Sequence, residues 1–288
     1  MKRAYRMVIC AFLLRAMCGA SPLHAASANA NPRVEYLRTI PSVREFTQPR
    51  GFFSKMARWL VGAPEKPEIQ RPYSVTQDSL GRLLIADPGE RGIHIYDFEK
   101  RKYQFLTGPK GSELISPIEV VCDRNDDIYV TDSVRARIYV FDSQGRPLRI
   151  IGNAAAEPRF ARPTGMALDR AARRLYVTDT LRHQLLVLGL DGSFIRAIGK
   201  RGAGEAEFNF PTGVAISNGK LFVVDALNFR IQSFTPGGEW LGSFGRPGNQ
   251  SGTLYRPKGI AADTDGHLYV VDNLFETVQV FDSAGQLL

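Results

Sequence analysis

A repeat of about 46 residues is the feature that most constrains the fold of this chain. Prolines recur at positions 72, 117, 163, 211 and 257, in steps of 45, 46, 48 and 46 residues. A second series, in steps of 45, 47, 46 and 47 residues, consists of aspartates: Asp87, Asp132, Asp179, Asp225 and Asp272. Nine residues after each aspartate comes a large apolar residue: Tyr96, Phe141, Leu188, Phe234 and Phe281. Three registers in phase indicate five copies of one structural unit.

Each unit consists of short runs rich in β-branched and aromatic residues, separated by turn residues. The fourth unit has such runs at 221–224, 231–234 and 240–244. Every run is as long as a strand, and no unit contains an apolar stretch of helical period and length. Four strands in one unit predict the four-stranded blade of a β-propeller, in which each sheet is buried between its neighbours. The sequence therefore predicts an all-β propeller over residues 71–288.

The units resemble NHL repeats. The likeness is best in the fourth and fifth units, through Pro211-Thr212-Gly213-Val214-Ala215 with Leu221-Phe222-Val223-Val224-Asp225, and through Pro257-Lys258-Gly259-Ile260-Ala261 with Leu268-Tyr269-Val270-Val271-Asp272. The first unit has Ser74 in place of the glycine, the second has Glu119, and the third has Leu188 in place of the later aromatic residue. The resemblance implies an interaction platform for protein or RNA, although a minority of relatives are metal-dependent lyases or hydrolases.

The number of blades is left open by the sequence. NHL propellers usually have six blades, so the five units either close as a five-bladed ring or form a six-bladed propeller that is one blade short. The segment Val34–Ile40 resembles an outer strand. Paired with the last blade, it would close the ring and cover exposed sheet edges. If closure fails, the unpaired edge should promote self-association.

Residues 1–25 have the pattern of a secretory signal peptide, with basic residues, an apolar stretch at 7–14 and a small-residue cleavage site at 23–25. Lipid modification of Cys18 is an alternative, but Met17 before it is bulkier than such processing favours. Cleavage removes Lys2, Arg3, Arg6 and Arg15 from the 37 Lys and Arg, which leaves 33 against 29 Asp and Glu, or +4. Export to the periplasm or another extracytoplasmic space is expected. With so modest a charge, no nucleic-acid partner is expected.

Residues 26–70 form an N-terminal segment outside the repeat, with the predicted strand first. Within it, 51–61 places Phe52, Phe53, Met56, Trp59 and Leu60 on one face of an amphipathic helix of about three turns. So short a helix must dock on something to be stable. It either caps the propeller's own surface or lies on a membrane surface or partner, where its basic residues would meet anionic groups.

No enzyme motif supports catalysis. A metal centre needs several histidines or carboxylates at one point, and the mature chain has only His94, His183 and His267, at inequivalent positions in the repeat. Cys122 remains as a single cysteine at an apolar strand position, typical of a small core residue. We therefore expect no cofactor and no metal site. A metal-dependent lyase or lactone hydrolase of the propeller type is the alternative from a different class.

The five recurrent aspartates each end the second strand of a unit. A set of carboxylates in register suggests calcium, but a carboxylate at this place also accepts hydrogen bonds from the backbone N–H groups of the following turn. We expect the second, structural role for Asp87, Asp132, Asp179, Asp225 and Asp272.

The turns after these aspartates would project from one rim of a propeller and carry several arginines. Arg137 and Arg230 match the recurrent arginine of the NHL pattern, for which a contact with a neighbouring blade is expected. Arginines on one face can hold carboxylates bidentately, which favours a protein or peptide partner of the cell envelope. The predicted contact residues are Arg91, Arg135, Arg182, Phe229, Arg230 and Phe275.

Overall fold

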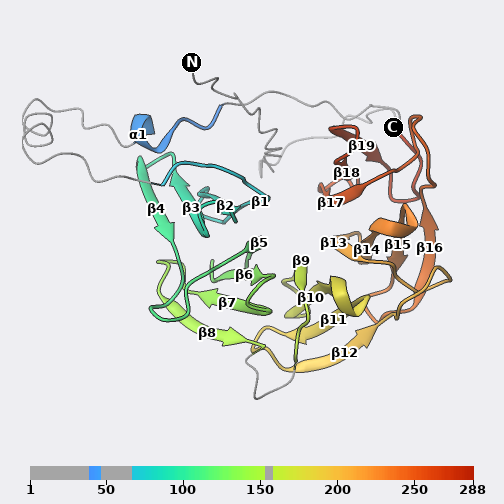
Figure 1. The fold of residues 1–288 in the computed structure, drawn as a ribbon, viewed down its shortest axis with the longest axis horizontal. Helices are drawn as coiled ribbons and strands as arrows, with labels where there is room; N and C mark the ends of the chain where they lie inside the picture. The colour runs from blue at the N-terminus through green and yellow to red at the C-terminus, as the bar shows by residue number, and fades with distance from the viewer. Residues whose placement is uncertain (1–38, 47–66, 153–157) are drawn as a thin grey trace, which may run out of the picture.

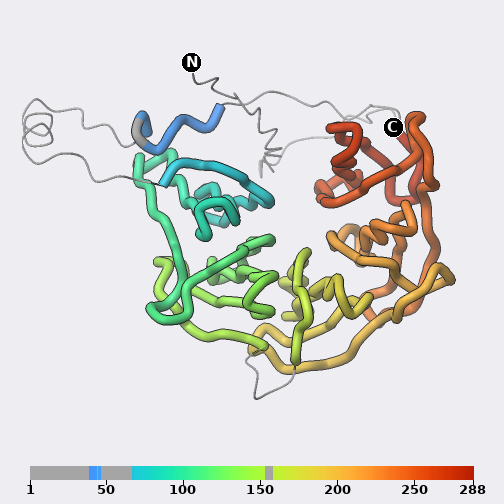
Figure 2. Tube along the Cα trace, viewed as in Figure 1, coloured from blue at the N-terminus to red at the C-terminus, as the bar shows by residue number. Residues whose placement is uncertain are grey.

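A computed structural model describes residues 39–46, 67–152 and 158–288. The strands form five antiparallel sheets that follow one another around an axis (Figure 1). The chain passes from one sheet to the next in sequence order, so each repeat is one blade (Figure 2). The prediction of an all-β propeller with five repeats is thereby confirmed.

Four blades have four strands and the fifth has three. The first blade comprises β1 to β4, at Ser74–Gln77, Leu83–Asp87, Gly92–Asp97 and Lys102–Leu106. The second comprises β5 to β8, at Pro117–Cys122, Ile128–Asp132, Arg137–Phe141 and Pro147–Ile151. The third comprises β9 to β12, at Pro163–Asp169, Arg174–Asp179, Gln184–Gly189 and Phe194–Ile198. The fourth comprises β13 to β16, at Pro211–Ser217, Lys220–Asp225, Arg230–Phe234 and Trp240–Phe244. The fifth comprises β17 to β19, at Pro257–Ala262, Leu268–Asp272 and Thr277–Phe281.

The hydrophobic core lies between consecutive blades. One cluster joins the first blade to the second and includes Cys122, which is 1% exposed, as expected for a core residue. Three further clusters join the second to the third, the third to the fourth and the fourth to the fifth. Because the middle strands are covered on both faces, they are apolar without alternation.

Inner strands of neighbouring blades approach closely, which explains the repeat glycine. A Cβ atom on Gly165 would lie 2.4 Å from the carbonyl oxygen of Thr212 in the next blade. Hydroxyl groups bond across the junctions: Thr131 Oγ1 donates to Thr164 O at 2.7 Å, and Thr212 Oγ1 donates to Lys258 O at 2.9 Å. At the first junction Ser74, which replaces the glycine, accepts from Val120 N at 3.2 Å. Close packing and hydrogen bonding thus fix the blades around the axis.

Among the described residues, no blade packs on one side of the fifth blade, where Figure 1 shows the widest interval in the ring, between β17–β19 and the first blade. Val271 is 42% exposed, whereas the equivalent residues of the other blades are fully buried: Ala86, Thr131, Thr178 and Val224. A Cβ atom on Gly259 would meet nothing nearer than 3.9 Å. Beyond β19, a single bridge between Phe281 and Leu287 begins a fourth strand.

Residues that precede the repeat cover the face of the first blade that is turned away from the second blade. The helix α1, Val43–Phe46, buries both of its terminal side chains against Leu83, Ile85 and Tyr96, and Ile40 packs on the same cluster. The sequence predicts a closing strand at 34–40, but Thr39 and Ile40 lie in no strand, and Ile40 contacts the first blade. The rest of that strand, the signal at 1–25, Cys18 and the helix predicted at 51–61 lie outside the described residues.

Candidate functional site

All five recurrent aspartates are fully buried and bind backbone. In Asp132, Oδ1 accepts from Val134 N and Arg135 N in the following turn, and Oδ2 accepts from Ile115 N and Ser116 N before the inner strand. Asp87 and Asp272 also accept from the following turn, which is the structural role expected of these residues. Asp179 and Asp225 differ, since their backbone donors come from the loop before the inner strand. We call the end of the propeller that holds these turns and entry loops the aspartate rim.

Asp87 shows how neighbouring groups keep a buried carboxyl group ionised. Although burial raises the pKa of this carboxyl, the His94 ring, with Nε2 3.4 Å from Oδ2, and hydrogen bonds from the backbone N–H groups of Gln70, Arg71 and Gly89 bring it down to about 2. The carboxylate therefore stays ionised at neutral pH and holds the rim together.

Arg230 is held inward by its own blade. Its Nε atom lies 2.9 Å from Asp225 Oδ2, and Nη2 donates to Gly204 O at 2.7 Å and Glu207 O at 3.0 Å. The contact with a neighbouring blade that the sequence suggests is thus replaced by an ion pair within the blade. These bonds leave Arg230 less available to a partner than the other rim arginines.

The turns of the aspartate rim share one backbone feature. The fourth residue after each aspartate has a left-handed φ between 52° and 58°: Arg91, Ala136, His183, Phe229 and Glu276. In the third and fourth blades the preceding residues form short 3-10 helices, at Thr180–Arg182 and Ala226–Asn228. Arg91 and Arg182 are exposed, and Arg135 donates to Glu113 O at 3.3 Å. Arg182 Nε lies 3.8 Å from Asp179 Oδ2, a loose ion pair.

Apolar side chains lie beside these arginines. The second residue after the aspartate is exposed in four blades: Val134 at 63%, Leu181 at 50%, Leu227 at 48% and Leu274 at 47%. Between the fourth and fifth blades, Tyr255 stands 6.0 Å from Phe229 and 6.1 Å from Phe275, measured between ring centroids. The sequence singles out both phenylalanines but not Tyr255, which occupies a position of the entry loops where the repeat has no common residue type.

A second set of cations surrounds the axis. The residue before the repeat proline is Arg71 in the first unit, Arg162 in the third and Arg256 in the fifth, and all three are exposed. Lys258 joins them from β17, with Nζ 4.1 Å from the centroid of the Tyr73 ring. We call Arg71, Tyr73, Glu119, Arg162, Arg256 and Lys258 the axial mouth. Each of its three arginines directly precedes the repeat proline, and this shared position is the sequence signal that could identify them.

The charged groups of the axial mouth shift one another's pKa values. The pKa of Lys258 is lowered, first by burial and then by the positive charges of Arg256 and Arg71. Burial raises the pKa of Tyr73 to about 12; Glu119 adds to this and Arg162 opposes it. Residues from the first, second, third and fifth blades thus act on one another at the axis.

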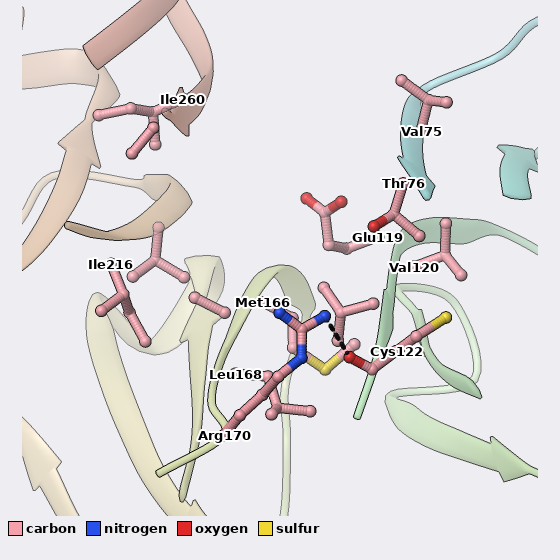
Figure 3. A pocket seen from close by; sticks show the side chains of 14 residues that line it. Val75, Thr76, Glu119, Val120, Cys122, Met166, Leu168, Arg170, Ile216 and Ile260 are labelled. Carbon is pink, nitrogen blue, oxygen red and sulfur yellow. Dashed lines mark hydrogen bonds between the residues drawn. The ribbon is translucent and has the colours of Figure 1, made fainter. Parts of the chain in front are cut away.

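Below the mouth, the inner strands line an open cavity of about 280 Å³. Figure 3 shows the Glu119 carboxylate pointing into its middle, while Arg170 lies nearer one end and donates to Cys122 O at 2.8 Å. Inner strands begin at the aspartate rim, since Pro117 is paired with Asp132 and Pro257 with Asp272. Residues early in these strands, such as Glu119 and Lys258, therefore lie toward that rim, and Arg170 toward the other.

Burial raises the pKa of Glu119 to about 7, although bonds to Ser74 and to Val120 N act against the shift. Three other units have glycine at this position: Gly165, Gly213 and Gly259. A carboxylate where the repeat has glycine is the sequence signal that could have identified this residue.

The three described histidines do not converge. His94 is buried in β3, where Nδ1 lies 2.8 Å from Tyr103 Oη, and His183 Nδ1 accepts from Phe210 N at 3.1 Å in the third blade. His267 belongs to a group with Asp263 and Asp265, whose ligand atoms lie within 4.8 Å of one another. That group stands in the turn between β17 and β18, at the rim opposite the axial mouth. The described histidines therefore supply no shared metal centre.

Helices in the described part of the chain are too short or too polar to cross a bilayer.

A family described as 6-bladed beta-propeller matches residues 167–243. Protein SUPPRESSOR OF QUENCHING 1, chloroplastic, of Arabidopsis thaliana is 24% identical over 77% of this chain. The match covers 26% of that protein, so the chain spans about a quarter of its length.

Three solved structures illustrate the range of proteins that share the fold. Virginiamycin B lyase from Staphylococcus aureus has a TM-score of 0.60 at 17% identity, over 76% of this chain and 69% of the lyase. A chain of the nidogen–laminin complex has a TM-score of 0.58 at 18% identity, over 77% and 82%. A gluconolactonase from Xanthomonas campestris has a TM-score of 0.57 at 20% identity, over 76% and 74%. At these identities the likeness concerns the fold, which hosts unrelated functions.

Proposed function

We propose that this protein is an exported propeller that binds a protein or peptide partner on the aspartate rim. The observation that carries the proposal is the juxtaposition, on equivalent turns of two blades, of exposed aliphatic residues with arginines: Val134 with Arg135 and Leu181 with Arg182. Protein interfaces combine these features, with apolar anchors at the centre and arginine beside them.

Charge favours an acidic partner. In the described part of the chain, Arg91 has no carboxylate within ion-pair distance, and Arg182 reaches Asp179 only at 3.8 Å. Guanidinium groups in this state offer a fork of donors that a carboxylate can fill. The aromatic group of Phe229, Tyr255 and Phe275 adds an anchor for an apolar side chain at one end of the rim.

An enzymatic function is supported less well. The lyase and the gluconolactonase share the fold, but the described histidines of this chain are separated among three blades. The chain of the nidogen–laminin complex has the same fold in an assembly of proteins. Export rests on the signal pattern of residues 1–25, and contact of residues 51–61 with a membrane surface stays part of the proposal.

The experiment is affinity capture from an envelope extract of the source organism. The bait is the full chain, as wild type and as the triple variant Arg91→Glu, Arg135→Glu, Arg182→Glu. A matched control reverses three exposed cations of the opposite rim: Arg124→Glu, Arg173→Glu and Lys220→Glu. Both triple variants change the net charge equally, so a non-specific charge effect would appear in both.

We expect one protein to be retained by the wild type and by the control and lost from the rim variant. With the purified partner, the rim variant should bind at least tenfold more weakly while both variants keep the wild-type melting temperature. Equal retention by all three baits, or equal loss from both variants, would contradict a partner site on the aspartate rim.

A further inference from the structure

The axial mouth gathers positive charge without matching acid. Arg71, Arg162, Arg256 and Lys258 make no ion pair with any other described residue, and Glu119 is the one carboxylate that the described residues place in the cavity below them. Uncompensated like charges at one place oppose folding by mutual repulsion. A ligand anion would relieve that repulsion, so the arrangement is typical of a binding site rather than of a structural ion cluster.

The position of Glu119 sets a second requirement for the ligand. Glu119 projects into the cavity from β5, and its Ser74 and Val120 contacts come from the wall rather than from the cavity's centre (Figure 3). A ligand that fills the cavity must therefore present a hydrogen-bond donor to this carboxyl group, since a purely apolar or purely anionic group there would be unfavourable.

Size limits the ligand. A cavity of about 280 Å³ corresponds to roughly nine water molecules at about 30 Å³ each. That volume matches a small metabolite.

We propose that the axial mouth binds a small hydroxy- or amino-carboxylate, with the carboxylate held by Arg71, Arg162, Arg256 and Lys258 and the hydroxyl or amino group directed to Glu119. This site is distinct from the outer arginines of the partner surface. It does not depend on the proposed function.

The titratable groups that line the cavity are Glu119, Cys122 and Arg170. The groups of the axial mouth come from four of the five blades: Arg71 and Tyr73 precede β1, Glu119 lies in β5, Arg162 precedes β9, Arg256 precedes β17 and Lys258 lies in β17. The inner strand β13 contributes none, because its residues are Pro-Thr-Gly-Val-Ala-Ile-Ser. A single anion at the axis therefore lies between cations of different blades.

The test is a calorimetric titration of the full chain with malate and with succinate, in buffer of about 0.15 M ionic strength. The two dicarboxylates differ by one hydroxyl group, so their comparison isolates the contribution of the donor. We expect saturable binding of malate and at least fivefold weaker binding of succinate.

Two sets of variants separate the two parts of the site. Arg162→Gln with Lys258→Gln should weaken both ligands at least tenfold. Glu119→Gln and Glu119→Gly should remove the preference for malate; glycine is the residue found at this position in three other blades, so the second variant keeps the proposal testable if the first misfolds.

The triple variant of the opposite rim, Arg124→Glu, Arg173→Glu, Lys220→Glu, serves as the control. It should bind malate within twofold of wild type, because these exposed residues follow the far ends of the inner strands, and exposed charges farther apart than about 8 Å are largely screened at this ionic strength. No saturable binding of either dicarboxylate, or a malate preference that persists in both Glu119 variants, would overturn the axial site. Neither outcome would bear on the proposed partner site at Arg91, Arg135 and Arg182.

Discussion

Lys258 Nζ lies 4.1 Å from the centroid of the Tyr73 ring, and this contact joins the fifth blade to the first. Elsewhere in the ring, consecutive inner strands pack directly on one another. Between the first and last blades the space is wider (Figure 1), so a cation over an aromatic face spans it. The long lysine stem suits this position, since it reaches across while its ammonium group stays near the axis.

Removing this contact should weaken the coupling between the terminal blades. We expect Tyr73→Ala and Lys258→Met to show a coupling free energy of about 0.5–2 kcal/mol in a double-mutant cycle of urea unfolding. Tyr73→Phe keeps the aromatic face and should preserve most of that coupling. If the two single changes are additive, the contact contributes nothing to stability.

The repeat glycines should differ in their tolerance of a methyl group. Gly165→Ala places a Cβ atom where the carbonyl oxygen of Thr212 lies 2.4 Å away, so blades must move apart. We expect a loss of about 1–3 kcal/mol in the free energy of unfolding. Gly259→Ala is the matched control, with no atom nearer than 3.9 Å, and should leave the stability within about 1 kcal/mol of wild type.

Comparison of Gly165→Ala with Gly259→Ala also tests whether the fifth blade lacks a close neighbour among the described residues. Equal losses at both positions would mean that the fifth blade also has a close neighbour, and the exposure of Val271 would then need another explanation.

The blades were predictable because each repeat carries its own strand pattern, turn residues and closing aspartate. Cys122 in the core and the equal turns after the aspartates follow from that local pattern. The covering of the first blade by 39–46 was not predictable, because α1 has only four residues and its burial depends on a sheet formed later in the chain.

The axial mouth was not predictable from the sequence for a related reason. Arg71, Arg162 and Arg256 are far apart in the sequence, and only the ring brings them to one axis. Glu119 departs from the repeat, but the consequence of that departure depends on the cavity that the other inner strands line. Arg230 could have been assigned to Asp225, since the two residues pair directly across β14 and β15.

Loss of the Asp225 carboxylate should be severely destabilising. This residue accepts from Asn209 N, Asn228 Nδ2, Arg230 Nε and Gln232 Nε2. Asp225→Ala leaves a largely buried guanidinium without its counter-charge, so we expect a loss of about 3–5 kcal/mol in urea unfolding. Asp282→Ala is the control; it removes turn bonds to Ala284 N and Gln286 N at the surface and should cost about 1 kcal/mol. Similar losses in both variants would contradict a special role for the Asp225 network.

Glu119 should make the protein less stable as pH rises from about 4.5 to about 7. Burial raises the pKa of its carboxyl from 4.5 to about 7, so in this range the folded chain binds more protons than the unfolded chain. The free energy of unfolding therefore falls with increasing pH over this window, by about 1–3 kcal/mol from this group. Glu119→Gln, which cannot ionise, should lose that part of the slope and become more stable than wild type near pH 7.

The measurement is urea unfolding at several pH values from 4 to 8 without added ligand, compared as differences between wild type and variant so that the other titrating groups cancel. Glu239→Gln, at an exposed position in the turn before β16, is the control and should reproduce the wild-type slope. A Glu119→Gln profile parallel to that of wild type would mean that this carboxyl titrates normally, in contact with bulk water. The cavity would then lack the desolvation that gives Glu119 its raised pKa.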